Sequence, residues 1–235
     1  MCTVTWIRQD GGYQVLCNRD EKRSRARALP PKVHLANRVR YLAPIDGNFG
    51  GTWIAANEFG LTICLLNGVG PTKAQRQFTS RGLLVLDLMS ATSAEEACDL
   101  VKRIDLEQFA PFTLAMLDPF APEAIFQWTG GFKTTAPRAD KRLPLTSSSF
   151  DTERVCAARR REFARRERSA AASLYEFHAS HFAGPGAYSP CMHRSDAETV
   201  SFSWINVTPT EVDFLYTPDA PCRRSPGEHQ TLRRI

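Results

Sequence analysis

The sequence has no long hydrophobic run: no stretch approaches the ~18 consecutive apolar residues of a membrane-spanning helix. The N-terminus also lacks the basic-then-apolar layout of a secretory signal peptide, so a cytoplasmic location is expected. No internal repeat, linker or low-complexity tract divides the chain. We therefore interpret the 235 residues as one domain, 1–235, with a loosely held tail over residues 221–235.

The cysteines are not spaced as they are in disulfide-rich or metal-binding proteins. The cysteines are odd in number and no two stand in C-x-x-C spacing, which argues against both a disulfide scaffold and a zinc site, so no metal is expected. Most of these thiols should be small buried side chains in a reducing compartment. The seven cysteines are Cys2, Cys17, Cys64, Cys98, Cys156, Cys191 and Cys222.

Acidic residues are absent from residues 22–40, which carry seven Lys or Arg, and residues 153–168 carry seven Arg against three Glu. The first zone should be a loop interrupted by Pro30 and Pro31, and the second a helix with a solvated basic face. Neither has the interleaved stacking aromatics of a nucleic-acid module, so nucleic acid is not expected as a partner. His178 and His181 lie at the end of the predicted Arg-rich helix, where a cationic side chain interacts favourably with the C-terminal end of the helix dipole.

Alternating apolar runs around tight turns predict hairpins. TVTWI and YQVLCN flank Asp10-Gly11, and TWIAA and LTICLLN flank Asn57 to Gly60. Further strands are predicted over 113–117 and 125–128, and TVSFSWINV and VDFLYT form a last pair. Helices are predicted over 81–89, from Ser93, and over about 151–177. The order predicts a layered α+β domain, for which a four-layer helix–sheet–sheet–helix sandwich fits; periodicity alone does not exclude two layers.

Cys2 follows Met1 directly, and a small second residue permits removal of the methionine. The α-amine has an ordinary pKa of about 7.7 to 8.0 and the thiol one of about 8.5, so a freed amine could take the thiol proton near neutral pH. Nucleophile and base would then share one residue. The alternative is a core thiol on the first strand, on one face with Val4 and Trp6.

Four motifs, MCTVTW, CNRDE, GGTWIAANEFGLTICLLN and LTSSSF, resemble the NRDE family, which includes the transport and Golgi organisation protein of eukaryotes. The resemblance covers nearly the whole chain. That family is similar, more distantly, to N-terminal-nucleophile hydrolases of the choloylglycine hydrolase and penicillin acylase type. The resemblance implies a four-layer αββα sandwich and a mature N-terminal cysteine that cleaves amides.

The resemblance also implies catalytic roles. Cys2 would be the nucleophile, and Asn67 would lend an oxyanion-hole amide. Arg19 would favour the thiolate and Asp20 would hold the α-amine. Those hydrolases separate the arginine and aspartate by two residues, whereas here they are adjacent and would point to opposite faces of a continuing strand. Either Glu21 takes the acidic role or the strand bends.

Two supporting residues and a ligand-binding rim complete the expected site. Asn18 belongs to the CNRDE motif, and Ser147 stands in LTSSSF near the position where those hydrolases place an asparagine. The acid-free run should edge the cleft beside Cys2 and attract a carboxylate or phosphate. Arg194 either binds ligand as well or closes a loop. The ligand-binding candidates are Arg23, Arg25, Arg27 and Arg194.

Two functions remain open from the sequence. The chain is an amide or thioester hydrolase, or an acyl transferase, that acts through Cys2 on a small anionic acyl compound. Alternatively it has kept the cleft and lost the chemistry, and carries an amphipathic anion such as haem, acyl-CoA or a lipid-like molecule. Members of the NRDE family are linked to such trafficking. No cofactor is required in either case, and the oligomeric state cannot be read from these residues.

Overall fold

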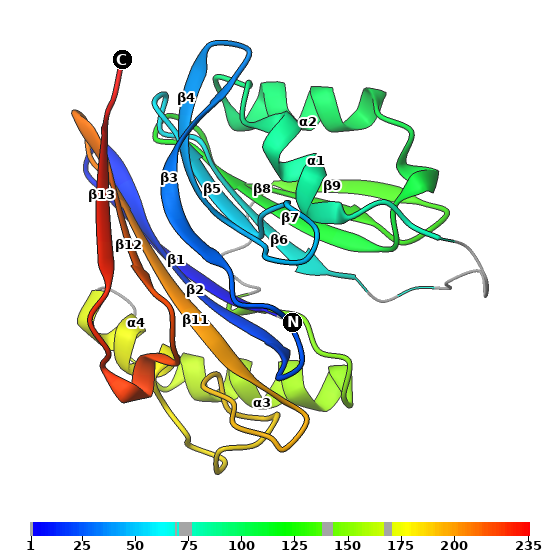
Figure 1. The fold of residues 1–235 in the computed structure, drawn as a ribbon, viewed down its shortest axis with the longest axis vertical. Coiled ribbons are helices and arrows are strands. Elements are labelled where there is room, and N and C mark those ends of the chain that lie inside the picture. Colours follow the sequence, from blue (N-terminus) through cyan, green and yellow to red (C-terminus); the bar gives the residue numbers. More distant parts are fainter. Residues whose placement is uncertain (1, 69, 71–76, 138–142, 167–170) are drawn as a thin grey trace.

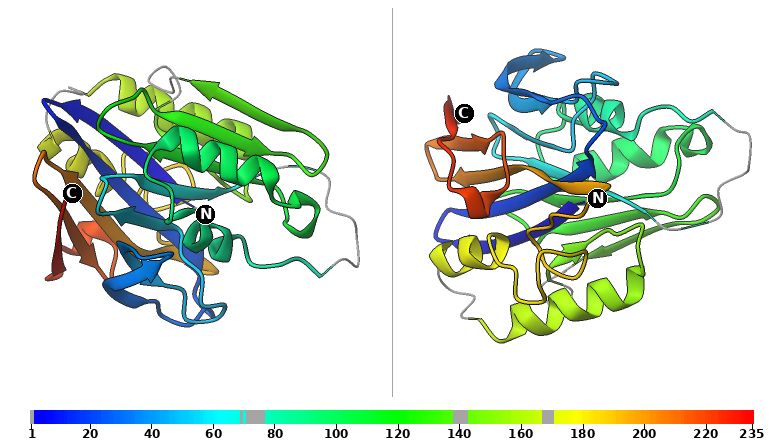
Figure 2. Two further views of the ribbon diagram at one scale, coloured as in Figure 1. Left: turned by 90° about the horizontal axis from the view of Figure 1, so that it is seen from above. Right: turned by 60° about the horizontal axis from the view of Figure 1, so that its bottom comes forward.

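The computed structural model describes residues 2–68, 70, 77–137, 143–166 and 171–235. In this part of the chain two antiparallel sheets pack face to face, and helices cover the outer face of each (Figure 1). The right view in Figure 2 also shows helices on both outer sides of the strands. The expected αββα sandwich is confirmed, and the two-layer alternative is excluded.

The six-stranded sheet has the strand order β10-β1-β2-β11-β12-β13. Its β1–β2 hairpin turns at Asp10-Gly11 as predicted, because Gly11 adopts a positive φ of 69° that a residue with a Cβ would strain. The hairpin register places Cys2 opposite Arg19. The strands are β1 (Cys2–Gln9), β2 (Gly12–Lys22), β10 (Leu145–Thr146), β11 (Ala197–Val207), β12 (Glu211–Thr217) and β13 (Glu228–Arg233).

The seven-stranded sheet runs in chain order from β3 to β9. The predicted β5–β6 pair forms around Asn57, whose side-chain oxygen accepts hydrogen bonds from the backbone N–H groups of Phe59 and Leu61. The strands are β3 (Leu29–Ala36), β4 (Val39–Ile45), β5 (Ile54–Asn57), β6 (Thr62–Asn67), β7 (Phe112–Leu117), β8 (Ala124–Trp128) and β9 (Lys133–Pro137).

Helices α1 and α2 cover the seven-stranded sheet, and α3 and α4 cover the six-stranded sheet (Figure 1). Ser93 caps α2 by accepting from the backbone N–H of Glu96, as its position predicts. The bounds are α1 (Arg81–Leu88), α2 (Ala94–Arg103), η1 (Leu106–Gln108), α3 (Thr152–Ala164), α4 (Ala171–His178) and η3 (Pro221–Arg223).

The core between the two sheets is built by alternate residues of the β1–β2 hairpin. Cys2, Val4 and Trp6 face the other sheet together with Val15 and Cys17. The residues between them, such as Thr3 and Asn18, face α3 and α4 instead, because successive side chains of a strand point to opposite faces. This alternation puts the thiol of Cys2 between the sheets, at the end of the core.

Three expectations about secondary structure are wrong. The loop expected around Pro30 and Pro31 is an edge strand, β3, whose pairing with β4 shifts register between Leu29 and Lys32; an edge strand tolerates the missing N–H groups at such an irregularity. The tail expected to be loose forms β13, which pairs with β12 and buries Leu232. The long helix is two helices, since α3 ends at Ala164.

Among the described residues, no helix is both long and apolar enough to cross a membrane.

Candidate active site

Cys2 opens β1 and lines a cavity of about 290 Å³ at the end of the inter-sheet core. The cavity walls come from both sheets and from the start of α1. Five residues predicted for the site line it together, and Trp53 and Arg81 also line it. The five are Cys2, Arg19, Glu21, Arg25 and Asn67.

The thiol of Cys2 loses its proton more readily than an ordinary cysteine thiol. A hydrogen bond with the thiol of Cys17 is the largest cause that lowers the pKa of Cys2 below that of an ordinary cysteine. The charge of the N-terminal amine lowers this pKa as well, and the charge of Arg19 contributes least. Burial and the charge of Asp20 raise this pKa but do not outweigh the causes that lower it. The same thiol–thiol hydrogen bond and burial raise the pKa of Cys17, so Cys2 is the one of the pair that ionises first.

The nitrogen of Cys2 is held by Ser147. The backbone N–H of Cys2 donates to Ser147 Oγ at 3.0 Å, and the backbone N–H of Ser147 donates to the Cys2 carbonyl at 3.0 Å. This double contact arises because β10 pairs with the first residues of β1, with Thr3 opposite Thr146. Ser147 thus holds the atom that would become the α-amine if the preceding residue were removed.

Arg19 lies across the wall of the cavity. Its guanidinium stacks over the ring of Trp53, with 4.2 Å from Cζ to the ring centroid, and pairs with the carboxylate of Asp46 and with Glu21 at 3.5 Å. Asp46 also pairs with Arg25 at 3.0 Å. Burial raises the pKa of Asp46, but hydrogen bonds from Arg25 and from the backbone N–H of Phe49 outweigh it, so the carboxyl stays ionised.

Asp20 and Arg19 point to opposite faces of β2, because the strand continues through both residues to Lys22. Asp20 is fully buried toward the helices, where Oδ1 accepts a hydrogen bond from Thr199 Oγ1 at 2.7 Å and Oδ2 lies 3.8 Å from the guanidinium of Arg159. Burial raises the pKa of Asp20 even though Arg159 opposes it. Glu21 is therefore the carboxylate of this motif that reaches the cavity.

Asn18 is a structural anchor on the helix side of β2. Its Nδ2 donates to the carbonyls of His178 and Pro190, each at 2.9 Å, and its Oδ1 lies 3.0 Å from His178 Nδ1. His178 Nε2 contacts Thr5 Oγ1 at 2.9 Å. Burial lowers the pKa of His178 to about 3, so the ring is neutral and the expected interaction of a cationic His178 with the helix dipole is wrong.

The basic run is divided between two cavities. Arg25 lines both the Cys2 cavity and a neighbouring cavity of about 190 Å³, whereas Arg23 and Arg27 line only the neighbouring one. Arg23 is paired with Glu198 at 2.9 Å. Arg194 lines neither cavity: it pairs with Asp196 and stacks over Phe150.

Arg81 is a cation of the cavity that the sequence did not indicate. It begins α1, is largely buried, and donates from Nη1 to the carbonyl of Pro111 at 2.8 Å. Burial lowers its pKa, although Glu21 and Cys2 oppose this. The buried Arg159 was missed as well, because along the chain it is indistinguishable from the exposed arginines of the same helix.

The family described as Transport and Golgi organisation 2 matches residues 1–174 of the chain. No curated protein sequence is significantly similar.

Three solved structures share the arrangement of layers. The N-acylethanolamine-hydrolyzing acid amidase ortholog of Caenorhabditis elegans superposes with a TM-score of 0.61 at 12% identity, over 100% of both chains. Penicillin V acylase from Agrobacterium tumefaciens gives 0.56 at 13% identity, over 93% of this chain and 84% of that one. A mutant of the conjugated bile acid hydrolase from Clostridium perfringens gives 0.55 at 11% identity, over 99% and 92%. The fold is that of N-terminal-nucleophile hydrolases.

Proposed function

Because the chain belongs to the Transport and Golgi organisation 2 family and has a hydrolase-like fold, we propose that it hydrolyses the amide or thioester bond of a small acyl compound through Cys2. One observation carries the proposal. The pKa of the Cys2 thiol is lowered although the thiol is buried, and the thiol faces a cavity that also contains Arg19 and Asn67. A buried structural thiol would instead have a raised pKa, as Cys64 has.

The proposed reaction uses the residues of the cavity in sequence. After removal of Met1, the free α-amine of Cys2 is oriented by Ser147 and accepts the thiol proton. The thiolate attacks the carbonyl carbon of the substrate, and the side-chain amide of Asn67 stabilises the oxyanion. The amine then returns the proton to the leaving amine or thiol as the bond breaks. Water, deprotonated by the same amine, then attacks the carbonyl carbon of the resulting thioester. The carbon–sulfur bond breaks, the acid is released, and the Cys2 sulfur takes the proton back from the amine.

The cavity favours a small acyl group with a negative charge. Its volume of about 290 Å³ is at the lower end of the ~300–1,000 Å³ of ligand pockets, which suits a short acyl chain better than a haem macrocycle. Arg19 and Arg25 are neutralised by Asp46 and Glu21, whereas the described contact of Arg81 is with a backbone carbonyl. Arg81 is therefore the cation that would select an anion. The similar solved proteins are named as acylases and amidases, which supports the class of bond.

Transport of an amphipathic anion, haem or acyl-CoA included, is the second candidate. The observation that favours it is Ser147, a hydroxyl beside the Cys2 nitrogen at the place where the resemblance leads us to expect an asparagine. A carrier would bind the same anions reversibly and form no covalent intermediate, which distinguishes it from the enzyme.

We expect the purified, untagged protein to lack Met1 and to react with iodoacetamide at Cys2 first. Its lowered pKa gives more thiolate at neutral pH than Cys98, whose pKa is raised by burial, so the rate of Cys2 labelling should reach half its maximum at a lower pH. Peptide mapping after limited alkylation measures this.

Incubation with N-acyl amino acids should also add the acyl mass to the Cys2 peptide. A retained Met1, or labelling of Cys2 no faster than that of Cys98, contradicts the proposal that the protein is a hydrolase acting through Cys2.

Arg81→Met should weaken discrimination for anionic substrates. Removing the cation should raise KM for an N-acyl amino acid roughly tenfold and leave KM for its methyl ester nearly unchanged. Arg81→Lys should retain part of the preference, and Arg27→Met is the matched control because Arg27 lies outside the Cys2 cavity. Steady-state kinetics at low and high salt measure both. An equal change in KM for the acid and for the ester would mean that Arg81 contributes to packing and does not recognise the anion.

A further inference from the structure

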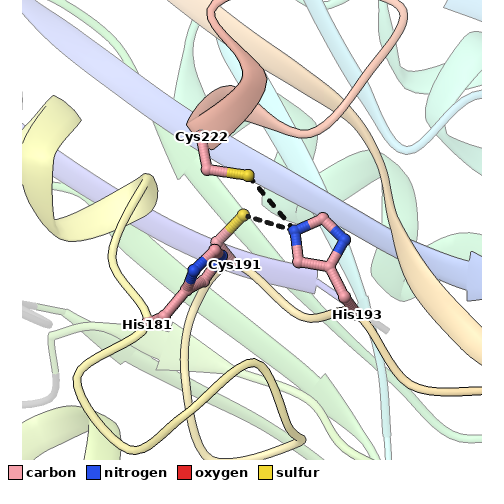
Figure 3. A group of neighbouring side chains, drawn as sticks. All are labelled: His181, Cys191, His193 and Cys222. Carbon is pink, nitrogen blue, oxygen red and sulfur yellow. Dashed lines mark hydrogen bonds between the residues drawn. The ribbon is translucent and has the colours of Figure 1, made fainter.

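Two histidines and two cysteines converge on one side of the six-stranded sheet. His181, Cys191 and His193 lie in the segment between α4 and β11, and Cys222 lies in η3 after β12 (Figure 3). Each offers one ligand atom, and no two of these atoms are farther apart than 4.8 Å. All four lie beyond residues 1–174, which match the family, and none belongs to the Cys2 cavity.

The four atoms lie nearly as close together as the ligand atoms of a tetrahedral ion, with separations of up to 4.8 Å. Bond lengths of about 2.3 Å to sulfur and 2.0–2.1 Å to nitrogen place the ligand atoms of a zinc tetrahedron about 3.3–3.8 Å from one another. His193 Nε2 lies 3.5 Å from Cys191 Sγ and 3.2 Å from Cys222 Sγ. The rings of His181 and His193 meet edge to face with 5.1 Å between centroids. Small rotations of the side chains would complete the tetrahedron.

The carboxylate of Glu198 lies near the imidazole ring of His193. Glu198 Oε2 lies 3.8 Å from His193 Nδ1, on the side of the ring opposite Nε2, which faces both thiols. At 3.8 Å this is an electrostatic contact and not a hydrogen bond, and it favours Nε2 as the metal-facing atom of the ring. Glu198 is itself held by Arg23 at 2.9 Å and by Arg223 at 3.5 Å.

We propose that His181, Cys191, His193 and Cys222 bind one Zn²⁺ ion. Two thiolates and two imidazoles form the donor set for which zinc is the ordinary divalent ion, and the two thiolate charges balance the charge of the metal. Four protein ligands leave no open coordination position, so the ion is structural and takes no part in hydrolysis. The proposal departs from the expectation of no metal, which rested on the absence of C-x-x-C spacing. That spacing is not informative here, because Cys222 lies 29 residues after His193 and only the fold brings them together.

The ion would fasten the segment between α4 and β11 to η3. That segment supports the buried side of the CNRDE motif: the Pro190 carbonyl accepts from Asn18 at 2.9 Å, and the backbone N–H of Met192 donates to Thr199 Oγ1 at 2.9 Å. Thr199 in turn donates to Asp20 at 2.7 Å. Loss of the ion should therefore lower the melting temperature of the protein.

The test is metal content of the untagged chain, purified under reducing conditions, loaded with Zn²⁺ and freed of excess ion. We expect one zinc per chain by mass spectrometry of the metal. Co²⁺ in place of zinc should give thiolate-to-metal charge-transfer absorption and tetrahedral d–d bands. Cys222→Ser, at a half-buried position, and His181→Gln, at an exposed one, should each weaken zinc binding at least about 100-fold. Glu198→Gln should weaken it about 10- to 100-fold.

Cys156→Ser and His229→Gln are the matched controls, because neither residue belongs to the cluster, and both should keep one zinc per chain. Circular dichroism shows whether Cys222→Ser folds. If it does not, zinc binding by His181→Gln is compared with that of the wild type instead. Zinc far below one per chain after loading, or cobalt spectra unchanged in both variants, overturns the proposal. So does a peptide map that finds Cys191 and Cys222 joined by a disulfide in protein purified under these conditions.

Discussion

Replacing Cys2 by serine should reduce hydrolysis of N-acyl substrates by at least about a thousandfold while the protein keeps its fold. Serine preserves the size of the side chain and its place between the sheets. Its hydroxyl, however, is a far weaker acid than a thiol whose pKa is already lowered, chiefly by the hydrogen bond with Cys17. Single-turnover kinetics and thermal melting measure the two parts of this prediction.

Cys156→Ser is the matched control for that experiment, because Cys156 is a half-buried cysteine on α3 outside the cavity. It should retain turnover within about twofold. Binding of an N-acyl amino acid by Cys2→Ser should also stay within a few-fold of wild type, since the substrate carboxylate contacts Arg81 in our proposal. Undiminished hydrolysis by Cys2→Ser would remove Cys2 as the nucleophile.

Replacing Arg159 by methionine should destabilise the protein by about 3–5 kcal/mol, the usual cost of leaving one partner of a buried ion pair alone. Arg159 is 1% exposed and Asp20 is fully buried. The guanidinium lies 3.8 Å from Asp20, donates to Thr3 Oγ1, and donates to the Ala187 carbonyl at 2.8 Å. Chemical denaturation measures the loss, and Arg160→Met, at an exposed position of the same helix, should unfold close to wild type.

The cost of Arg159→Met should depend on pH. Burial raises the pKa of Asp20 in the folded protein, and Arg159 opposes this, so its removal raises that pKa further. A carboxyl with a raised folded pKa stabilises the fold in its protonated form, fully below the unfolded pKa, and loses that contribution as pH rises through the folded pKa. The variant should therefore lose less stability at acid pH than at neutral pH.

A second substitution tests whether Asp20 is the reason. Asp20→Asn removes the buried charge, so the double variant Arg159→Met with Asp20→Asn should recover a large part of the lost stability and show no acid-side recovery of its own. Additive losses in the double variant would mean that Arg159 acts through Thr3 and Ala187 alone.

Local features of the sequence determined much of the fold. The two early hairpins were predicted because glycine-containing turns separate short apolar runs, and the start of α2 because Ser93 can cap it. These signals act within a few residues and need no tertiary partner. The family motifs added Cys2 and the αββα order, and the alternation rule anticipated that Arg19 and Asp20 would face opposite sides.

The tertiary structure decided what depends on distant partners. The strand β3 forms despite Pro30 and Pro31 because it is at an edge, and β13 forms because β12 offers it a free side. Arg159 differs from the neighbouring arginines only by what the sheet places against it. Cys222 joins Cys191 and the two histidines only after β11 and β12 have formed. Burial and proximity of such groups arise from contacts far apart in the chain, which no local pattern encodes.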